Sequence, residues 1–111
     1  MLTLDIPDVT ENLLDQMVQK IVDAFAPQKV ILFGSHAWGT PHKDSDVDLL
    51  IIMKSDSRPA RRSAEISLAC RPRNLPVDFL VKTPTEIAHR LKIGDPFLKR
   101  ILEQGRVLYA K

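Results

Sequence analysis

The sequence contains a single cysteine, Cys70, so no disulfide can form within the chain. Its longest apolar run, which ends at Met53, is far too short to span a membrane. The first residues, MLTLDIPDVTENL, are acidic and lack the basic-then-apolar order of a secretion signal. None of the three histidines stands with a cysteine or a second histidine at zinc-ligand spacing. We therefore expect a protein of the reducing cytoplasm, with no membrane span and no zinc site.

The charge balance is also slight. Sixteen Lys and Arg residues against fourteen Asp and Glu residues give a net charge of +2, which does not by itself indicate nucleic-acid binding. Hydrophobic residues make up 44% and charged residues 27%, as in an ordinary globular protein. A chain of 111 residues is large enough for one core and too small for two. We expect one domain over residues 1–111.

The most informative stretch is residues 30–53, VILFGSHAWGTPHKDSDVDLLIIM. It reads as an apolar strand, a Gly-Ser turn, a polar loop and a second apolar strand that opens with two carboxylates. Gly34 has no Cβ, so backbone N–H groups at the turn can approach phosphate oxygens. Ser35 stands where a short helix could begin, and its hydroxyl could cap that helix or contact a phosphate. Asp46 and Asp48 are two residues apart on a strand and share a face, where a divalent cation such as Mg²⁺ would offset their repulsion.

Hydrophobic periodicity and local capping signals predict the remaining elements. The helices are expected at residues 10–26, 59–70, 83–94 and 95–105, and the strands at residues 30–33, 46–53, 75–81 and 107–109. Thr10 can cap the first helix and Pro27 ends it, while Thr83 and Glu86 fit a capping box. The order is helix, strand, strand, helix, strand, helix, helix, strand. It predicts a mixed α/β fold whose sheet is covered mainly on one side by helices.

At these residues the chain resembles the minimal nucleotidyltransferase domains of the DNA polymerase β-like superfamily. The pattern of that family is Gly-Ser, ten residues, then Asp-x-Asp, and here Gly34-Ser35 is followed after ten residues by Asp46-Val47-Asp48. The wider form GSxAxG is present over residues 34–39, and Asp78 within Val77-Asp78-Phe79 matches a third carboxylate on a later strand. The closing residues 105–109 are similar as well, so the resemblance covers nearly the whole chain. It implies a polymerase β-like α/β (α+β) fold with a mixed sheet of four to five strands.

The resemblance also implies a reaction, in which a hydroxyl attacks the α-phosphate of an NTP, ATP above all, and pyrophosphate leaves. Two Mg²⁺ ions would be held by Asp46 and Asp48, and Asp78 would complete the attacking-side site and could take the proton from the hydroxyl. The N–H of Gly34 and Ser35 would hold the leaving phosphates. Small members of this family often act as antitoxins of a HEPN-type ribonuclease toxin encoded by a neighbouring gene. Some transfer AMP to a tyrosine of that toxin.

Three hypotheses for the function stay open. The first is an Mg²⁺-dependent nucleotidyltransferase that modifies a protein partner as an antitoxin. The second is an antitoxin that neutralises its toxin by binding and masking, with idle carboxylates, for which Asp46 and Asp48 merely end a turn and Asp78 pairs with a nearby arginine. The third is a nucleotidyltransferase for a small molecule such as an aminoglycoside, which the short chain disfavours because no second domain forms an acceptor pocket. An oligomer is left open.

Side chains around the motif carry weaker signals. Many members of the family have arginine where this chain has His36 and Trp38. Trp38 is interpreted as a packing residue rather than a stacking surface for the base, and neither His36 nor His42 is given a role. The arginines between Arg58 and Arg73 are interpreted as a solvated helix face, with partner docking left open and direct nucleic-acid binding not expected. Core packing is the default for Phe97 and Leu98, although either could contact a partner.

Overall fold

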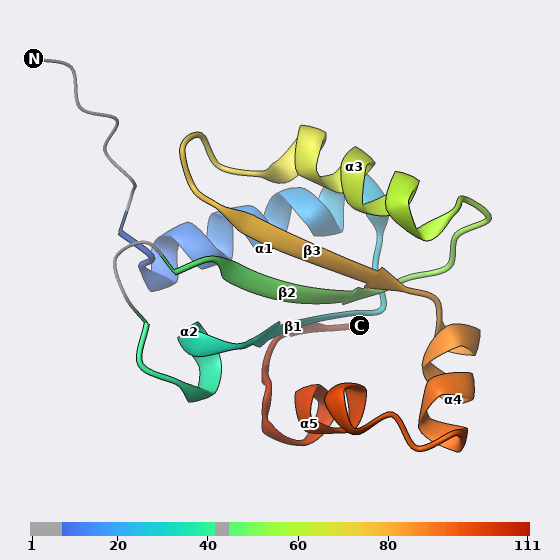
Figure 1. Cartoon of the computed structure of the whole chain (residues 1–111). Helices are drawn as coiled ribbons and strands as arrows, with labels where there is room; N and C mark the ends of the chain where they lie inside the picture. Colours follow the sequence, from blue (N-terminus) through green and yellow to red (C-terminus); the bar gives the residue numbers. More distant parts are fainter. Residues whose placement is uncertain (1–7, 42–44) are drawn as a thin grey trace, which may run out of the picture.

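Four strands form one mixed sheet in the order β3-β2-β1-β4. The computed structural model describes residues 8–41 and 45–111. Strand β1 is antiparallel to β2 and β4, and β2 is parallel to β3. The last residue of β1 and the first residues of β2 and β3 therefore meet at one end of the sheet (Figure 1). The strand bounds are β1 Lys29–Phe33, β2 Val47–Ile52, β3 Val77–Lys82 and β4 Arg106–Ala110.

The described residues form five helices around this sheet, and the ends of these helices lie close to the predicted ones. Thr10 caps α1, because its hydroxyl accepts a hydrogen bond from the N–H of Leu13. The capping box of α4 has both its bonds, between Thr83 and Glu86. A four-residue helix begins at Ser35, where the sequence allowed one. The helices are α1 Glu11–Phe25, α2 Ser35–Trp38, α3 Pro59–Cys70, α4 Pro84–Lys92 and α5 Pro96–Gln104.

The two faces of the sheet pack against different helices. Helices α1 and α3 cover one face, and α4 and α5 lie against the other (Figure 1). The larger buried cluster lies on the α1 and α3 face, so this side carries most of the core. The predicted α/β fold class is confirmed, with a mixed sheet of four strands. The helices do not lie mainly on one side of the sheet as predicted, because α4 and α5 bury its second apolar face. Within the described residues, no helix is long and apolar enough to cross a membrane.

Side chains along each strand alternate between these faces, as a pleated strand requires. On β2, Val47, Leu49 and Ile51 belong to the cluster under α1 and α3. Leu50 and Ile52 belong to the cluster under α4 and α5. Asp48 has the same parity as Leu50 and Ile52, and it therefore projects on the α4 and α5 side.

Candidate active site

The turn after β1 brings the backbone against a carboxylate. Gly34 has φ 77° and ψ −155°, a conformation open essentially to glycine alone. Its carbonyl accepts hydrogen bonds from the N–H groups of Ala37 (2.9 Å) and Trp38 (3.0 Å), which starts α2. A Cβ on Gly34 would overlap the carboxylate of Asp48. The backbone at Gly34 therefore passes directly against the Asp48 carboxylate, and its approach to a phosphate stays a prediction.

Ser35 is the first residue of α2 and is half-buried. The carbonyl of Ser35 accepts the N–H of Gly39 at 3.2 Å, which closes the single helical turn. No partner of the Ser35 hydroxyl is found among the residues that the structure describes. The first N–H groups of a helix have no intrahelical acceptor. The hydroxyl of Ser35 and the N–H groups of Ser35 and His36 are therefore available to a ligand at the end of the sheet, whereas the N–H of Ala37 donates to the carbonyl of Gly34.

Three carboxylates gather at the same end. Asp48 is directly opposite Asp78 in the parallel pairing of β2 with β3, and it is opposite Phe33 of β1. The N–H of Val47 donates to the carbonyl of Pro76 at 3.0 Å, which ties the start of β2 to the residue before β3. Asp46 lies two residues before Asp48 and is exposed. The structure thus brings together all three predicted carboxylates.

Electrostatics confirm that these carboxylates act on one another. Burial raises the pKa of Asp48, and the neighbouring charges of Asp78 and Asp46 raise that pKa further, while His36 acts in the opposite direction. A carboxylate that is half-buried among like charges is stabilised by a cation. A positive charge would therefore stabilise this group of carboxylates. These are the carboxylates for which the sequence predicts Mg²⁺ binding.

The donor set fits such an ion in chemistry but is incomplete by itself. Carboxylates supply the oxygen ligands that Mg²⁺ prefers. Within residues 8–41 and 45–111, however, no three His, Cys, Asp or Glu side chains converge closely enough to hold a metal ion. Magnesium usually binds through one or two carboxylates and completes its shell with water and substrate phosphates. The site therefore fits an ion whose remaining ligands are water molecules or phosphate oxygens.

The sequence predicted the environment of Trp38 in α2 but not that of His36. The Nε2 atom of His36 is 3.3 Å from the carbonyl oxygen of Ser45, so His36 links α2 to the residue before Asp46. No role was predicted for His36, and its place inside the motif was the only signal. Trp38 packs against Phe33, with ring centroids 6.3 Å apart, which confirms the packing interpretation. His42 lies outside the described residues.

The surroundings of Asp78 test its alternative role as the partner of a nearby arginine. Asp78 is exposed, because it stands at the open end of β3. It makes no ion pair with an arginine within the described part of the chain. The arginine salt bridge considered as its alternative role is therefore absent there.

The arginines between Arg58 and Arg73 are mostly solvated, as expected. Arg58, Arg61, Arg71 and Arg73 are exposed. Arg62 is the exception, since it is only 7% exposed.

Comparisons with known proteins agree with this geometry. Residues 14–109 match the family described as "Nucleotidyltransferase domain". A protein of Methanocaldococcus jannaschii, named "Putative protein adenylyltransferase MJ1305", is 47% identical over 108 residues. That alignment covers 88% of this chain and 70% of the relative.

Solved structures share the fold at lower identity. A crystal structure described as a "putative nucleotidyltransferase" from Sulfolobus solfataricus has a TM-score of 0.63 and 21% identity, and it aligns over 90% of this chain and 79% of its own. A mutant of the toxin-antitoxin MntA-HpeT has a TM-score of 0.56 and 20% identity, with 94% of this chain and 75% of the other covered. At these identities the likeness establishes the fold, which is that of the polymerase β-like nucleotidyltransferases.

Proposed function

Because this chain belongs to the nucleotidyltransferase domain family, we propose that it transfers AMP from ATP to a hydroxyl group of a protein partner. One observation carries the proposal: Asp46, Asp48 and Asp78 gather beside a Gly34 turn whose backbone passes against the Asp48 carboxylate. The M. jannaschii relative is named for protein adenylyltransfer, which supports both AMP and a protein acceptor.

The reaction divides among the residues by position. The acceptor oxygen forms a bond to the α-phosphorus, the bond from that phosphorus to the bridging oxygen breaks, and pyrophosphate leaves with the electron pair. Bound Mg²⁺, as two ions, would neutralise the charge on the attacking and leaving oxygens. Asp46 and Asp48 would hold these ions. Asp78 completes the attacking side and accepts the proton of the hydroxyl. The N–H of Gly34 and the hydroxyl of Ser35 bind the leaving phosphates.

The biological role that we propose is that of an antitoxin. Structures of the toxin-antitoxin MntA-HpeT share the fold of this chain, which supports a toxin as its partner. We propose that this partner is a HEPN-type ribonuclease encoded by a neighbouring gene. Residues 1–111 would act as one minimal nucleotidyltransferase domain, in the cytoplasm where ATP is available. The match over residues 14–109 supports the single domain.

The test pairs this protein with the product of its neighbouring gene. Both are incubated with MgCl₂ and each NTP in turn, and the intact masses are measured. We expect the partner to gain one or more AMP units with ATP, and no gain with Asp46→Asn. Asp56→Asn serves as the matched control, because Asp56 is an exposed aspartate outside the site. Its mass gain should equal that of the unchanged protein.

Other results would identify the other hypotheses. If the partner is silenced in a stable complex without a mass gain, and Asp46→Asn silences it equally, the protein is a masking antitoxin. If neither protein gains mass but ATP is consumed when an aminoglycoside is added, the acceptor is a small molecule.

A further inference from the structure

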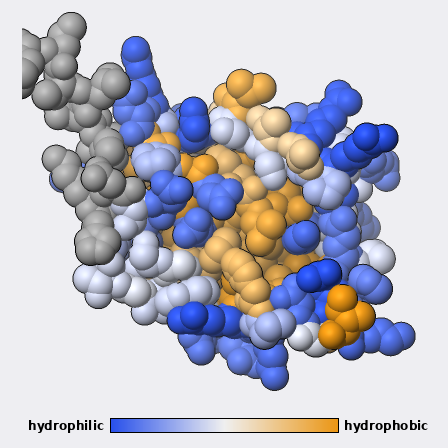
Figure 2. Space-filling model, viewed as in Figure 1, coloured by the Kyte–Doolittle hydropathy of each residue, from blue (hydrophilic) through white to orange (hydrophobic). Residues whose placement is uncertain are grey.

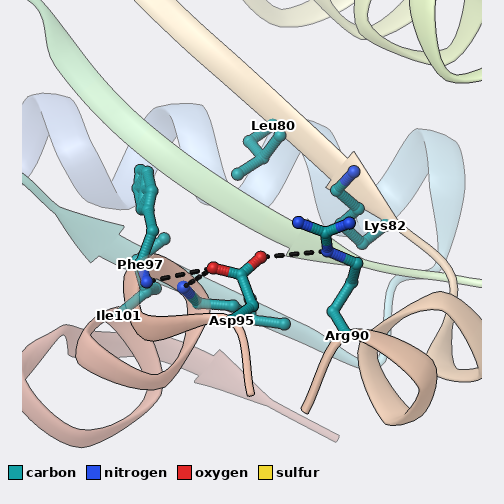
Figure 3. Close-up of a pocket in the computed structure, with 7 residues that line it drawn as sticks. Leu80, Lys82, Arg90, Asp95, Phe97 and Ile101 are labelled. Atoms are coloured by element: carbon teal, nitrogen blue, oxygen red, sulfur yellow. Dashed lines mark hydrogen bonds and ion pairs between the residues drawn. The ribbon is translucent and has the colours of Figure 1, made fainter. Parts of the chain in front are cut away.

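A cavity of about 340 Å³ opens between β3 and α5 (Figure 3). Leu80 points into it from β3, and Phe97 and Ile101 of α5 lie across from Leu80. Its lining residues are Leu80, Lys82, Arg90, Asp95, Phe97, Leu98 and Ile101. Figure 2 shows hydrophobic side chains gathered at the middle of this view, bordered by hydrophilic ones. The cavity is at the lower end of the range of about 300–1,000 Å³ found for ligand pockets.

This cavity and the carboxylates share one face of the sheet. Asp78, Leu80 and Lys82 alternate along β3 with the residues that pack under α1 and α3, so all three project toward α4 and α5. At about 3.3 Å per residue, Leu80 follows Asp78 by about 7 Å. The ring of Phe97 contacts that of Phe33 edge-on, with centroids 5.6 Å apart, and Phe33 is opposite Asp48. Leu80 and Phe97, which line the cavity, are therefore near neighbours of Asp78 and Asp48.

The order of the strands decides which substrate can reach this cavity. Gly34 and Ser35, which we propose to bind the leaving phosphates, follow β1. Asp78 is on β3, and between them lies β2, which carries Asp48 and directly follows Asp46. In an in-line displacement the attacking and leaving oxygens are on opposite sides of the phosphorus. The acceptor must therefore approach from the β3 side, where the cavity opens.

The lining favours an acidic and apolar ligand. Lys82 makes no ion pair within the described residues. Arg90 donates to Asp95 at 3.0 Å, and Asp95 also accepts the N–H groups of Phe97 and Leu98 (Figure 3). Among the residues that line the cavity, two cations, Lys82 and Arg90, stand against one carboxylate, Asp95. Phe97 is 51% exposed, a large value for an aromatic residue beside a core.

From these observations we propose that the cavity binds the acceptor segment of the protein partner. The segment lies extended over the face of the sheet, places an apolar side chain between Leu80 and Phe97, and sets a carboxylate against Lys82. The span of about 7 Å from Asp78 to Leu80 corresponds to two residues of extended chain. The apolar residue is therefore two positions from the residue that receives AMP. This inference depends on the proposed function for its protein acceptor.

The experiment measures binding, so that it does not depend on catalysis. The probe is a synthetic peptide, acetyl-Glu-Phe-Ser-Tyr-Ser-Phe-Glu-amide, titrated into the ¹⁵N-labelled full chain. We expect the amide signals of Leu80, Lys82 and Phe97 to shift. A second peptide with lysine in place of both glutamates should bind about tenfold more weakly. Lys82→Glu should remove this preference, whereas Lys99→Glu, the same charge change at an exposed position of α5 outside the cavity, should preserve it.

Three outcomes would overturn the inference. The acidic and basic peptides could bind equally, the peptide could fail to bind, or the shifted amides could lie outside the cavity. MgATP is titrated as well, both into the free chain and into the chain with bound peptide. If ATP displaces the peptide and shifts the same amides, the cavity binds the nucleobase and not the acceptor. The transferase assay on the partner is a separate measurement. If that assay failed, the peptide-binding result could still be interpreted.

Discussion

Among single residues, Gly34 and Asp48 depend on each other, because they occupy the same small space after β1. The positive φ of Gly34 turns the chain sharply after β1, and the absent side chain gives the Asp48 carboxylate its space. Two separate costs would follow from a side chain here, because the backbone would be strained and the carboxylate displaced. These costs can be separated, since Gly94 also has a positive φ but has no atom within 4 Å of the position of a Cβ.

We predict that Gly34→Ala lowers the transfer rate by about 100-fold, since displacement of a reacting group by about 1 Å has an effect of that order. Gly94→Ala carries the backbone strain alone and should retain the rate. Both variants should lose stability, by about 1–3 kcal/mol each. Single-turnover transfer and urea unfolding measure the two effects. Equal rates in the two variants would mean that the Asp48 carboxylate has no role in the reaction.

The sequence could identify the residues of the site but not their contacts. Gly34, Ser35, Asp46 and Asp48 stand close together in one motif, and strand alternation alone places the last two on one face. The exposure of Asp78 and the contact of His36 with Ser45 depend on how distant segments pair. No local pattern encodes that pairing, so these two features had to come from the structure.

At the scale of elements, a partly buried ion pair between Arg62 and Glu86 joins α3 to α4. Arg62 donates from Nη1 to Oε1 of Glu86 at 2.6 Å and from Nε to the carbonyl of Ser57 at 2.8 Å. The same oxygen of Glu86 accepts the N–H of Thr83, so the pair is part of the α4 cap. Burial raises the pKa of Glu86, but the Thr83 N–H and the Arg62 guanidinium outweigh it and hold this pKa below its usual value of 4.5.

The lowered pKa fixes the sign of a pH dependence. A carboxylate whose pKa is lower in the folded protein stabilises it above the unfolded value, and this contribution is lost as the pH falls through the folded value. Glu86→Gln should therefore cost about 1–2 kcal/mol at neutral pH, and the difference should shrink below pH 4.5. Urea unfolding across this range measures it.

Glu65→Gln is the control for that prediction. Glu65 pairs with Arg61 on the surface of α3, where both side chains are exposed. Exposed pairs contribute little, so this substitution should leave stability nearly unchanged at every pH. A Glu86→Gln deficit that stayed constant with pH would show that the loss comes from packing and not from the charge.

Two neighbours on α5 have different environments, although the sequence treated them alike. Leu98 is 4% exposed and packs in the cluster under α4 and α5, whereas Phe97 is 51% exposed at the cavity. We predict that Leu98→Ala costs about 2–5 kcal/mol of stability. Phe97→Ala should cost about 1 kcal/mol, mainly the edge contact with Phe33. Thermal unfolding compares them, and equal losses would mean that Phe97 is as much a core residue as Leu98.

The helix ends could be predicted from the sequence because the residues that determine them lie at the ends themselves. Thr10, the capping box at Thr83 and the prolines at the starts of α3 and α5 mark them within a residue or two. The sequence did not predict that α4 and α5 pack on the face of the sheet from which Asp48 and Asp78 project. It depends on which face of the sheet each helix packs against, and both faces of the central strands are apolar.

At the scale of the whole molecule, the site exists only in the folded chain. Its parts come from the end of β1, the start of β2 and the start of β3, and the largest separation, from Gly34 to Asp78, covers much of the sequence. Folding forces like charges together at this point, since the raised pKa of Asp48 reports both burial and the neighbouring aspartates. Stability and function therefore oppose each other here, as they often do at active sites.

This opposition leads to a prediction for Asp48→Asn. A carboxyl whose pKa is higher in the folded protein destabilises it above that pKa, because the charged form is favoured in the unfolded chain. Without divalent cations at neutral pH, Asp48→Asn should thus raise the melting temperature by a few degrees. Added MgCl₂ should raise that of the unchanged protein, since an ion bound only by the folded state stabilises it, and should leave the variant unaffected.

Asp56→Asn removes a carboxylate of the same size from an exposed loop and should change neither response. If MgCl₂ shifted all three proteins equally, the effect would be one of salt and the ion would have no site among these carboxylates. If Asp48→Asn lowered the melting temperature without cations, Asp48 would stabilise the fold by contacts that outweigh its repulsion. If MgCl₂ raised the melting temperature only of the two proteins that keep Asp48, the cation would bind at this carboxylate and neutralise the repulsion among the aspartates.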